Sequence, residues 1–300
     1  MKQPSGLHPR NRHHDRYDFQ QLTAVCPELA PFVTRKFKSE TIDFANPDAV
    51  KALNRALLRT YYGIAFWDVP PGYLCPPVPG RADYIHYMAD LLSERNDAVI
   101  PRGKSVRVLD IGMGANCIYP IIGHHEYGWR FVGTDIDPIA IRAAKQIVAS
   151  NSALAGTVEC RLQPNASDIF KGVVQPGETF ALCICNPPFH ASLTEADAGN
   201  QRKWKNLGKD KTAAPVLNFG GKKSELWYPG GEAAFINNMI LQSAEAPQLC
   251  GWFTTLVSKK SNLPAIYKAL KSVRAVDVRT IEMNQGQKVS RVVAWTYKDK

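Results

Sequence analysis

The sequence predicts an α/β protein whose core is an open, mostly parallel sheet of seven strands. From residue 105 onward, short apolar runs alternate with segments of helical periodicity, which is the pattern of parallel strands joined by crossover helices. Several of these runs end in glycine-rich, acidic or Asn-Pro segments. Two alternating runs then close the sequence, and they predict an antiparallel hairpin at the edge of the sheet.

The individual elements follow from the spacing of apolar residues. The expected strands are residues 106–111, 129–134, 157–162, 179–185, 251–257, 275–283 and 290–297. The expected helices between them are residues 138–151, 232–243 and 263–271. Pro138 and Pro264 each fall in the first turn of a helix, where a missing N–H is tolerated.

Residues 1–100 have a different pattern and predict a mainly helical extension. Asn46 is an N-cap followed by Pro47, and a helix is expected from there to Gly63. Five prolines between residues 70 and 79 predict irregular structure until Asp83, where a second helix resumes. We therefore expect two parts, an extension over residues 1–100 and a sheet domain over residues 101–300.

Composition limits the classes of protein to which the chain can belong. Of its 300 residues, 45% are hydrophobic and 21% charged, which excludes a disordered or fibrous chain. No apolar run approaches the ~18–20 residues that span a bilayer, and residues 1–16 lack the apolar stretch of a secretory signal. Seven cysteines without a CxxC pair argue against disulfides and zinc. We expect a cytoplasmic protein with no metal and no membrane partner.

The formal net charge of +10 is concentrated in the two flanks of the chain. Residues 1–60 carry ten Lys and Arg against six Asp and Glu, and residues 199–300 carry seventeen against seven. Residues 61–198 between them carry ten against fourteen. Isolated charges usually form a solvated surface, but two basic flanks around a slightly acidic middle favour a polyanionic partner.

Ligands of an open parallel sheet bind beyond the carboxyl ends of its strands, and the first two strands end in polar motifs. Asp110-Ile111-Gly112-Met113-Gly114 ends the first strand, and its glycines allow the backbone to approach a nucleotide. The third glycine of the dinucleotide-binding pattern is absent, because Cys117 takes its place. Asp135 ends the second strand, where a carboxylate accepts hydrogen bonds from both hydroxyls of a ribose. Asp137 is the better N-cap for the next helix, which leaves Asp135 for a ligand.

A third motif, Asn186-Pro187-Pro188-Phe189, follows the fourth strand and distinguishes between cofactors. Two consecutive prolines make a rigid loop that presents the Asn186 side chain and the Pro187 carbonyl. A planar exocyclic amino group is a poor nucleophile because its lone pair is delocalised into the ring. Two acceptors for its N–H bonds favour the pyramidal transition state and hold the nitrogen in line with an electrophilic methyl group. Phe189 offers a face on which a flipped-out base stacks.

These motifs resemble those of class I S-adenosylmethionine-dependent methyltransferases that act on amino groups. The chain is most similar to the ribosomal RNA large-subunit adenine-N6 methyltransferases (RlmF type), which share a domain with the eukaryotic U6 small nuclear RNA adenine-N6 methyltransferase. The resemblance covers nearly the whole chain. It is carried by His8-Pro9-Arg10-Asn11-Arg12, Asn46-Pro47-Asp48-Ala49-Val50, Asp83-Tyr84-Ile85-His86, Gly112-Met113-Gly114-Ala115-Asn116-Cys117-Ile118-Tyr119-Pro120, Cys185-Asn186-Pro187-Pro188-Phe189 and Gly230-Gly231-Glu232.

The resemblance implies a Rossmann-like class I fold, S-adenosylmethionine as methyl donor, and N6-methylation of one adenosine in 23S ribosomal RNA, free or in an assembling large subunit. It implies no particular oligomer. It also implies that Asn186, Pro187, Pro188 and Phe189 hold the target adenine. The residues expected at the donor are Arg81, Asp110, Gly112, Gly114, Asp135, Asp168 and Asn186. Arg81 would bind the donor's carboxylate, although a surface position at a helix start suits it equally, and Asp168 would contact the donor's adenine ring.

The segment of residues 199–229 combines basic and aromatic side chains without periodicity. Loops of this length are normally functional or disordered, and the mixture suits a partly single-stranded RNA, with phosphates neutralised and bases stacked. A solvated insertion has the same composition. The basic residues expected to contact RNA are Arg10, Arg12, Lys203, Lys205, Lys222 and Lys223.

Other functions remain open at this point. Ribosomal RNA guanine-N2 methyltransferases also resemble the chain, because the Asn186 motif is followed by His190. Glutamine-N5 methylation of a protein is less favoured, since such enzymes usually carry Tyr in place of Phe189. A non-catalytic RNA-binding assembly factor with the same fold is the alternative from another class, and a nicotinamide dehydrogenase is a remote one.

Overall fold

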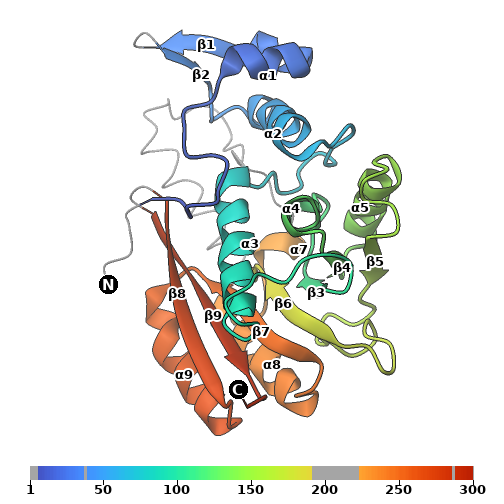
Figure 1. The fold of residues 1–300 in the computed structure, drawn as a ribbon, viewed down its shortest axis with the longest axis vertical. Helices are drawn as coiled ribbons and strands as arrows, with labels where there is room; N and C mark the ends of the chain where they lie inside the picture. Colours follow the sequence, from blue (N-terminus) through green and yellow to red (C-terminus); the bar gives the residue numbers. More distant parts are fainter. Residues whose placement is uncertain (1–5, 37–38, 191–222, 286–287, 300) are drawn as a thin grey trace.

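The computed structural model describes residues 6–36, 39–190, 223–285 and 288–299. Within these residues the centre of the molecule is a seven-stranded sheet with the order β5-β4-β3-β6-β7-β9-β8 (Figure 1). The strands are β3 (Arg107–Ile111), β4 (Arg130–Asp135), β5 (Val158–Leu162), β6 (Phe180–Cys185), β7 (Cys250–Val257), β8 (Asp277–Gln285) and β9 (Lys288–Thr296). Neighbours from β5 to β7 are parallel, and β9 is antiparallel to both β7 and β8. The predicted mostly parallel sheet with a C-terminal hairpin is confirmed.

Helices cover both faces of this sheet. The helices α3 (Val78–Ser93), α4 (Ile118–Tyr127) and α5 (Pro138–Ala149) share a core with Val108 of β3. The helices α8 (Gly231–Glu245) and α9 (Leu263–Ser272) share a second core with Leu109, the next residue of β3. Because successive side chains of a strand point to opposite faces, the two cores lie on opposite sides of one sheet.

The turn after β3 lies directly against β4. The Met113 N–H donates to the Thr134 carbonyl at 2.9 Å. A Cβ atom on Gly133 would collide with the Met113 side chain, which would then have to move. The close contact fixes the turn that connects β3 to α4, and that turn borders the candidate site.

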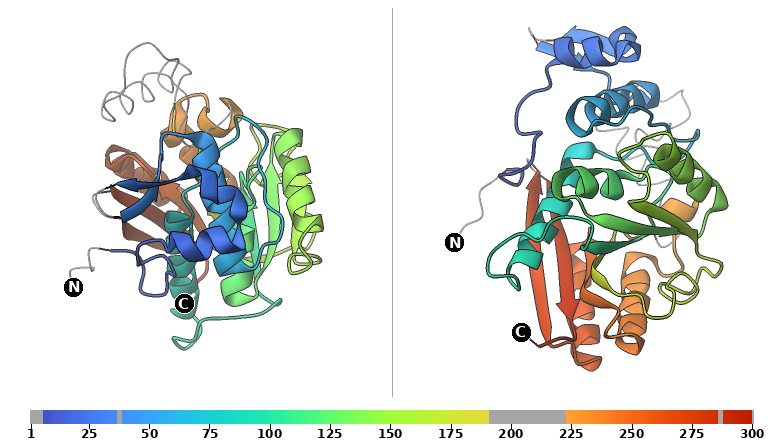
Figure 2. Two further views of the ribbon diagram at one scale, coloured as in Figure 1. Left: turned by 90° about the horizontal axis from the view of Figure 1, so that it is seen from above. Right: turned by 45° about the vertical axis from the view of Figure 1, so that its right-hand side comes forward.

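The N-terminal part contains helices, as predicted, and also a hairpin that the sequence did not indicate. Its elements are α1 (Phe19–Val25), a 3₁₀ helix (Pro27–Phe32), β1 (Val33–Lys36), antiparallel β2 (Ser39–Ile42) and α2 (Pro47–Tyr62). As predicted, Asn46 caps α2, since its side chain accepts from the N–H groups of Asp48 and Ala49, and Gly63 ends it at φ 66°. Figure 2 shows these elements at one end of the molecule.

The expectation that prolines exclude regular structure until Asp83 is wrong, because α3 already begins at Val78. Pro79 lies in the first turn of this helix, whose N–H groups have no intrahelical acceptor, so the proline removes no hydrogen bond. The helix packs against α4 and β8. Part of the expected extension therefore covers the sheet, and the division at residue 100 stays a prediction.

Among the described residues, no helix combines the length and the apolar character needed to cross a membrane.

Candidate functional site

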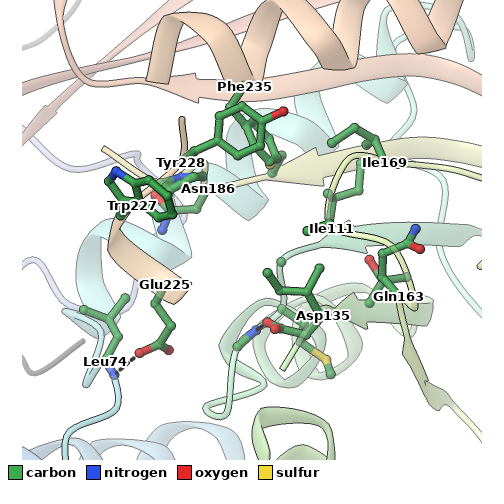
Figure 3. Close-up of a pocket in the computed structure, with 18 of the residues that line it drawn as sticks. Leu74, Ile111, Asp135, Gln163, Ile169, Asn186, Glu225, Trp227, Tyr228 and Phe235 are labelled. Atoms are coloured by element: carbon green, nitrogen blue, oxygen red, sulfur yellow. Dashed lines mark hydrogen bonds between the residues drawn. The ribbon is translucent and has the colours of Figure 1, made fainter. Parts of the chain in front are cut away.

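A cavity of about 670 Å³ lies at the carboxyl ends of β3, β4 and β6 (Figure 3). All three motifs selected from the sequence contribute to its lining, through Gly112 and Gly114 after β3, Asp135 at the end of β4, and Asn186 after β6. Its volume is typical of small-molecule and cofactor sites. The expectation that these three motifs meet at one edge of the sheet is confirmed.

The turn after β3 requires its glycines. Gly112 and Gly114 both have φ 69°, a left-handed conformation that other residues rarely adopt. The Gly114 N–H donates to Asp135 Oδ2 at 2.9 Å, and the Asp137 N–H donates to Asp135 Oδ1 at 2.8 Å. Burial raises the pKa of Asp135, and these backbone donors oppose that rise. A carboxylate has about four lone-pair positions, so Asp135 retains acceptor capacity for a ligand beside these backbone bonds.

Asp137 caps α5 as predicted, because its Oδ1 accepts from the Ile139 N–H at 2.8 Å. The Tyr73 hydroxyl donates to the other oxygen, Oδ2, at 2.6 Å. Tyr73 precedes Leu74 and Pro76, which line the cavity from the N-terminal part of the chain. The N-terminal part is therefore fastened beside the turn that carries Asp135.

Asp110 was expected at the donor but does not line the cavity. Its side chain is 1% exposed, and neither carboxyl oxygen has a hydrogen-bond partner among the described residues. Burial raises the pKa of Asp110 well above its usual range; the nearby Asp135 carboxylate adds to the rise, and the Arg81 guanidinium opposes it.

The Asn186 loop presents an unused acceptor. Asn186 Oδ1 is buried and has no partner among the described residues. Asn186 and Pro188 line the cavity, whereas Pro187 and Phe189 do not. The acceptor faces a space that a substrate amino group can occupy, and the roles expected of Pro187 and Phe189 at the target base stay predictions.

A buried chain of hydrogen bonds holds the end of β6 in place. The Cys185 N–H donates to the Tyr84 hydroxyl at 3.3 Å, and this hydroxyl pairs with Thr254 Oγ1 at 2.8 Å. Thr254 Oγ1 in turn donates to the Cys183 carbonyl at 2.7 Å. Tyr84 and Thr254 are fully buried, so α3 and β7 together fix the residue that precedes Asn186. Sequence reasoning selected Tyr84 only as part of a motif, without this role.

Arg81 reaches the cavity from α3. Its Nη1 donates to the Tyr119 hydroxyl at 2.7 Å, and its guanidinium carbon lies 5.5 Å from the centroid of the Tyr119 ring. Arg81 Nε is buried without a partner among the described residues. Arg81 lies near the start of α3, is partly exposed and lines the cavity, and its contact with the donor's carboxylate stays a prediction.

Asp168 also lines the cavity, on the loop after β5. Its Oδ2 accepts from Asn165 Nδ2 at 3.1 Å. Helix α8 holds this loop, because Gln242 Oε1 accepts from the Ile169 N–H at 2.7 Å. Gln163, which the sequence did not single out, lines the cavity from the same loop.

The segment around the short helix α7 (Lys223–Leu226) closes another side of the cavity. Glu225 Oε2 accepts from the Leu74 N–H at 2.9 Å, as the dashed line in Figure 3 shows. Trp227 and Tyr228 follow on the same side. Sequence reasoning assigned this segment to RNA contact only. The neighbouring Gly230-Gly231-Glu232 motif was part of the resemblance, but its residues do not line the cavity.

Two of the six predicted RNA-contact residues are fully described. Arg10 Nη2 lies 2.6 Å from Asp90 Oδ1, and Arg12 Nε lies 2.6 Å from Glu126 Oε1. Both pairs fasten the N-terminal segment to α3 and α4. Lys203, Lys205 and Lys222 lie outside the described residues, as does the side chain of Lys223 at the start of α7. An RNA role for all six stays a prediction.

In the part of the chain that the structure describes, no group of three or more His, Cys, Asp or Glu residues is placed to hold a metal ion. The sheet order, the reversed last strand and the glycine turn beside an Asn-Pro-Pro loop define a class I methyltransferase domain.

The comparisons with known proteins identify the family. The chain belongs to a family described as RNA methyltransferase, which it matches over residues 1–299. It is 57% identical over 312 residues to a protein from Photobacterium profundum named Ribosomal RNA large subunit methyltransferase F, covering 98% of this chain and 92% of that one. It is 58% identical over 298 residues to a protein of the same name from Yersinia enterocolitica, covering 99% and 89%.

Solved structures of a human protein share the fold over nearly the full length. The catalytic domain of human METTL16 bound to a MAT2A 3′UTR hairpin superposes with a TM-score of 0.80 at 28% identity, covering 98% of both chains. The N-terminal domain of human METTL16 in complex with SAH gives a TM-score of 0.76 at 26% identity, covering 98% of this chain and 100% of that one.

Proposed function

We propose that this protein transfers a methyl group from S-adenosylmethionine to the N6 atom of one adenosine in large-subunit ribosomal RNA. The names of relatives at 57% and 58% identity support the substrate. The METTL16 structures with an RNA hairpin and with SAH support the binding of RNA and of this donor. The observation that carries the proposal is Asn186 Oδ1, a buried acceptor that lines the cavity and has no hydrogen-bond partner among the described residues.

The residues around the cavity fit the methyl donor. Arg81 Nε is an unused, charged donor suited to the carboxylate of the methionine part. Asp135 retains acceptor capacity for the ribose hydroxyls. The left-handed turn at Gly112 and Gly114 lets the backbone come close to the ligand, and Asp168 is placed to contact the adenine ring. When bound, the donor supplies an electrophilic methyl group on a sulfonium centre.

The Asn186 loop acts on the amino group of the target base. Asn186 Oδ1 and the Pro187 carbonyl accept its two N–H bonds, which directs the nitrogen lone pair away from the ring and toward the methyl group. The hydrogen bonds of the Tyr84 hydroxyl with the Cys185 N–H and Thr254 Oγ1 hold the start of this loop in place, so little reorganisation is needed in the transition state. Direct displacement requires no protein nucleophile. Consistently, all seven cysteines are buried, and burial raises the pKa of thiols such as Cys185.

The two basic flanks of the chain bind the RNA substrate in this proposal. Arg10, Arg12 and the basic residues of segment 199–229 contact the RNA backbone, while the donor is held by the sheet domain of residues 101–300 and covered by the extension of residues 1–100. The natural substrate is 23S ribosomal RNA, free or in an assembling large subunit. A reducing cytoplasm is the compartment we propose for the enzyme, because its seven cysteines contain no CxxC pair.

Methyl transfer in vitro tests this proposal. We expect purified protein with labelled S-adenosylmethionine and unmodified 23S rRNA to form N6-methyladenosine, identified by nucleoside mass spectrometry. Asn186→Ala should lower kcat by about 10²–10³-fold, as loss of one transition-state hydrogen bond does elsewhere. Thermal stabilisation by S-adenosylhomocysteine should persist in that variant.

An exposed residue provides the matched control for this test. Asn96→Ala, on a surface loop, should keep the wild-type rate. Formation of N2-methylguanosine would favour the guanine methyltransferase instead, and full activity of Asn186→Ala would refute the mechanism. Absence of transfer to any RNA, with RNA binding intact, would favour the assembly factor.

A further inference from the structure

One tryptophan lies at the cavity instead of in a core. Trp227 is 39% exposed, whereas Trp67, Trp129, Trp252 and Trp295 are at most 2% exposed. Trp227 lines the cavity together with Asn186, and Figure 3 shows the two side chains on the same side of it. An indole is the largest flat apolar side chain, so a base that enters the cavity beside the proposed catalytic amide can stack on it.

The backbone ties Trp227 to the Asn186 loop. His190 and Trp227 form a parallel β-bridge. The His190 N–H donates to the Leu226 carbonyl at 2.9 Å, and the Tyr228 N–H donates to the His190 carbonyl at 3.2 Å. Because His190 follows Phe189 directly, these bonds fix the position of the indole relative to the loop that carries Asn186.

Tyr228, the next residue, packs against α8. Its ring meets Phe235 of α8 edge to face at 5.2 Å between centroids, and its hydroxyl accepts from Asn238 Nδ2 at 3.3 Å. Tyr228 and Phe235 also line the cavity. Asp135 and Gln163 lie on the other side of the space, as Figure 3 shows. The cavity thus has a polar side suited to the donor and an aromatic side beside Asn186.

We propose that Trp227 stacks on the target base and holds it in the plane in which Asn186 accepts from its amino group. This inference rests on the proposed function, because the occupant is the base that is methylated. Trp227 lines the cavity together with Asn186, and it would stack on the base in addition to Phe189, whose stacking role stays a prediction. Stacking is indifferent to the identity of the base, so Trp227 contributes affinity while Asn186 selects the amino group.

Tryptophan fluorescence reports on this contact directly. The protein has six tryptophans, and Trp204 lies outside the described residues, so the background variant is Trp204→Phe. In that protein saturated with S-adenosylhomocysteine, a short oligoadenylate should quench the emission of Trp227 by stacking on it. Adding Trp227→Phe should abolish the quenching. No quenching in the background variant, or equal quenching after Trp227→Phe, would overturn the proposal.

Kinetics provide the second measurement. Trp227→Ala should lower kcat/KM for ribosomal RNA about tenfold to hundredfold, which is the range that loss of one stacking contact produces. The KM for S-adenosylmethionine should stay within about twofold, and Trp227→Phe should recover most of the activity, because a ring that stacks is retained. Tyr267→Ala is the matched control, since Tyr267 is 41% exposed on α9 and does not line the cavity.

The two measurements separate this inference from the proposed function. If wild-type protein methylates ribosomal RNA and Trp227→Ala is equally efficient, the stacking role is wrong and the proposed function stands. If wild-type protein methylates no RNA but its Trp227 emission is quenched by oligoadenylate, the proposed function is wrong, whereas the stacking of a base on Trp227 is supported.

Discussion

Three buried polar groups beside the cavity have unused hydrogen-bonding capacity. Asn186 Oδ1, Arg81 Nε and both carboxyl oxygens of Asp110 have no partner among the described residues. An unsatisfied buried polar group costs about 1–3 kcal/mol, so such groups are rare in folded proteins unless a ligand pairs with them. Asn186 and Arg81 both line the cavity, and ligands that fill it would satisfy them.

Arg81→Lys should weaken donor binding while the net charge stays constant. Lysine lacks the planar fork that pairs with a carboxylate through two hydrogen bonds, and it also loses the contact with the Tyr119 ring. We expect about a tenfold higher Kd for S-adenosylhomocysteine, measured by calorimetry. Arg142→Lys, an exposed position on α5, is the control and should bind as wild type does. Equal Kd values of the two variants for S-adenosylhomocysteine would contradict a role of Arg81 in donor binding.

Asp110→Asn should stabilise the protein in a pH-dependent way. The pKa of Asp110 is raised in the folded state, so folded protein binds more protons than unfolded protein above the unfolded pKa of ~3.9. The free energy of unfolding therefore falls as the pH rises through this range, and asparagine removes that fall.

Calorimetric melting between about pH 4 and pH 8 checks this prediction. The melting temperature of Asp110→Asn should exceed that of wild type by an amount that grows with pH and then levels off. Asp97→Asn, at an exposed loop residue, should show no such trend. A constant difference, or destabilisation of Asp110→Asn at neutral pH, would contradict the assignment of a raised pKa to this carboxyl.

At the scale of elements, the sequence predicts regular strands and helices well where local signals act alone. The cap at Asn46 and the stop at Gly63 bound α2, and both follow from the preferences of single residues. The start of α3 at Val78 was missed because a proline is both a helix breaker and a good first-turn residue. The hairpin of β1 and β2 was missed because its strands are four residues long.

Tyr84→Phe tests the link between α3 and the Asn186 loop. Removing the hydroxyl takes the Tyr84 acceptor away from the Cys185 N–H and leaves Thr254 Oγ1 with its bond to the Cys183 carbonyl. We expect a loss of about 1–3 kcal/mol in the free energy of unfolding, measured with urea. A fall in kcat at unchanged donor affinity should accompany it, because the loop is no longer held rigidly. Tyr267→Phe, which removes an exposed hydroxyl, is the control. A normal kcat in Tyr84→Phe would show that Tyr84 contributes to stability but not to the positioning of the Asn186 loop.

For the molecule as a whole, the sequence indicated where the site lies but not all of the residues that line it. The carboxyl ends of parallel strands must meet at one edge, so Gly112, Asp135 and Asn186 were found from strand positions alone. Leu74, Glu225 and Trp227 approach the site from distant parts of the chain. Such contacts depend on tertiary packing, which no local pattern encodes.

The basic flanks predict a salt-dependent interaction with RNA. Replacing Lys203, Lys205, Lys222 and Lys223 with glutamine should weaken RNA binding and reduce the slope of log K against log salt concentration, because fewer counterions are released. Donor affinity should be unchanged. Filter binding at several salt concentrations measures the slope. An unchanged slope would show that these lysines do not contact the RNA backbone.

The most direct test of the proposed function is nucleoside mass spectrometry of 23S rRNA from a strain that lacks the gene. The proposal predicts that one N6-methyladenosine disappears, that wild-type protein restores it, and that Asn186→Ala does not. An unchanged N6-methyladenosine content, or the loss of an N2-methylguanosine in its place, would contradict it.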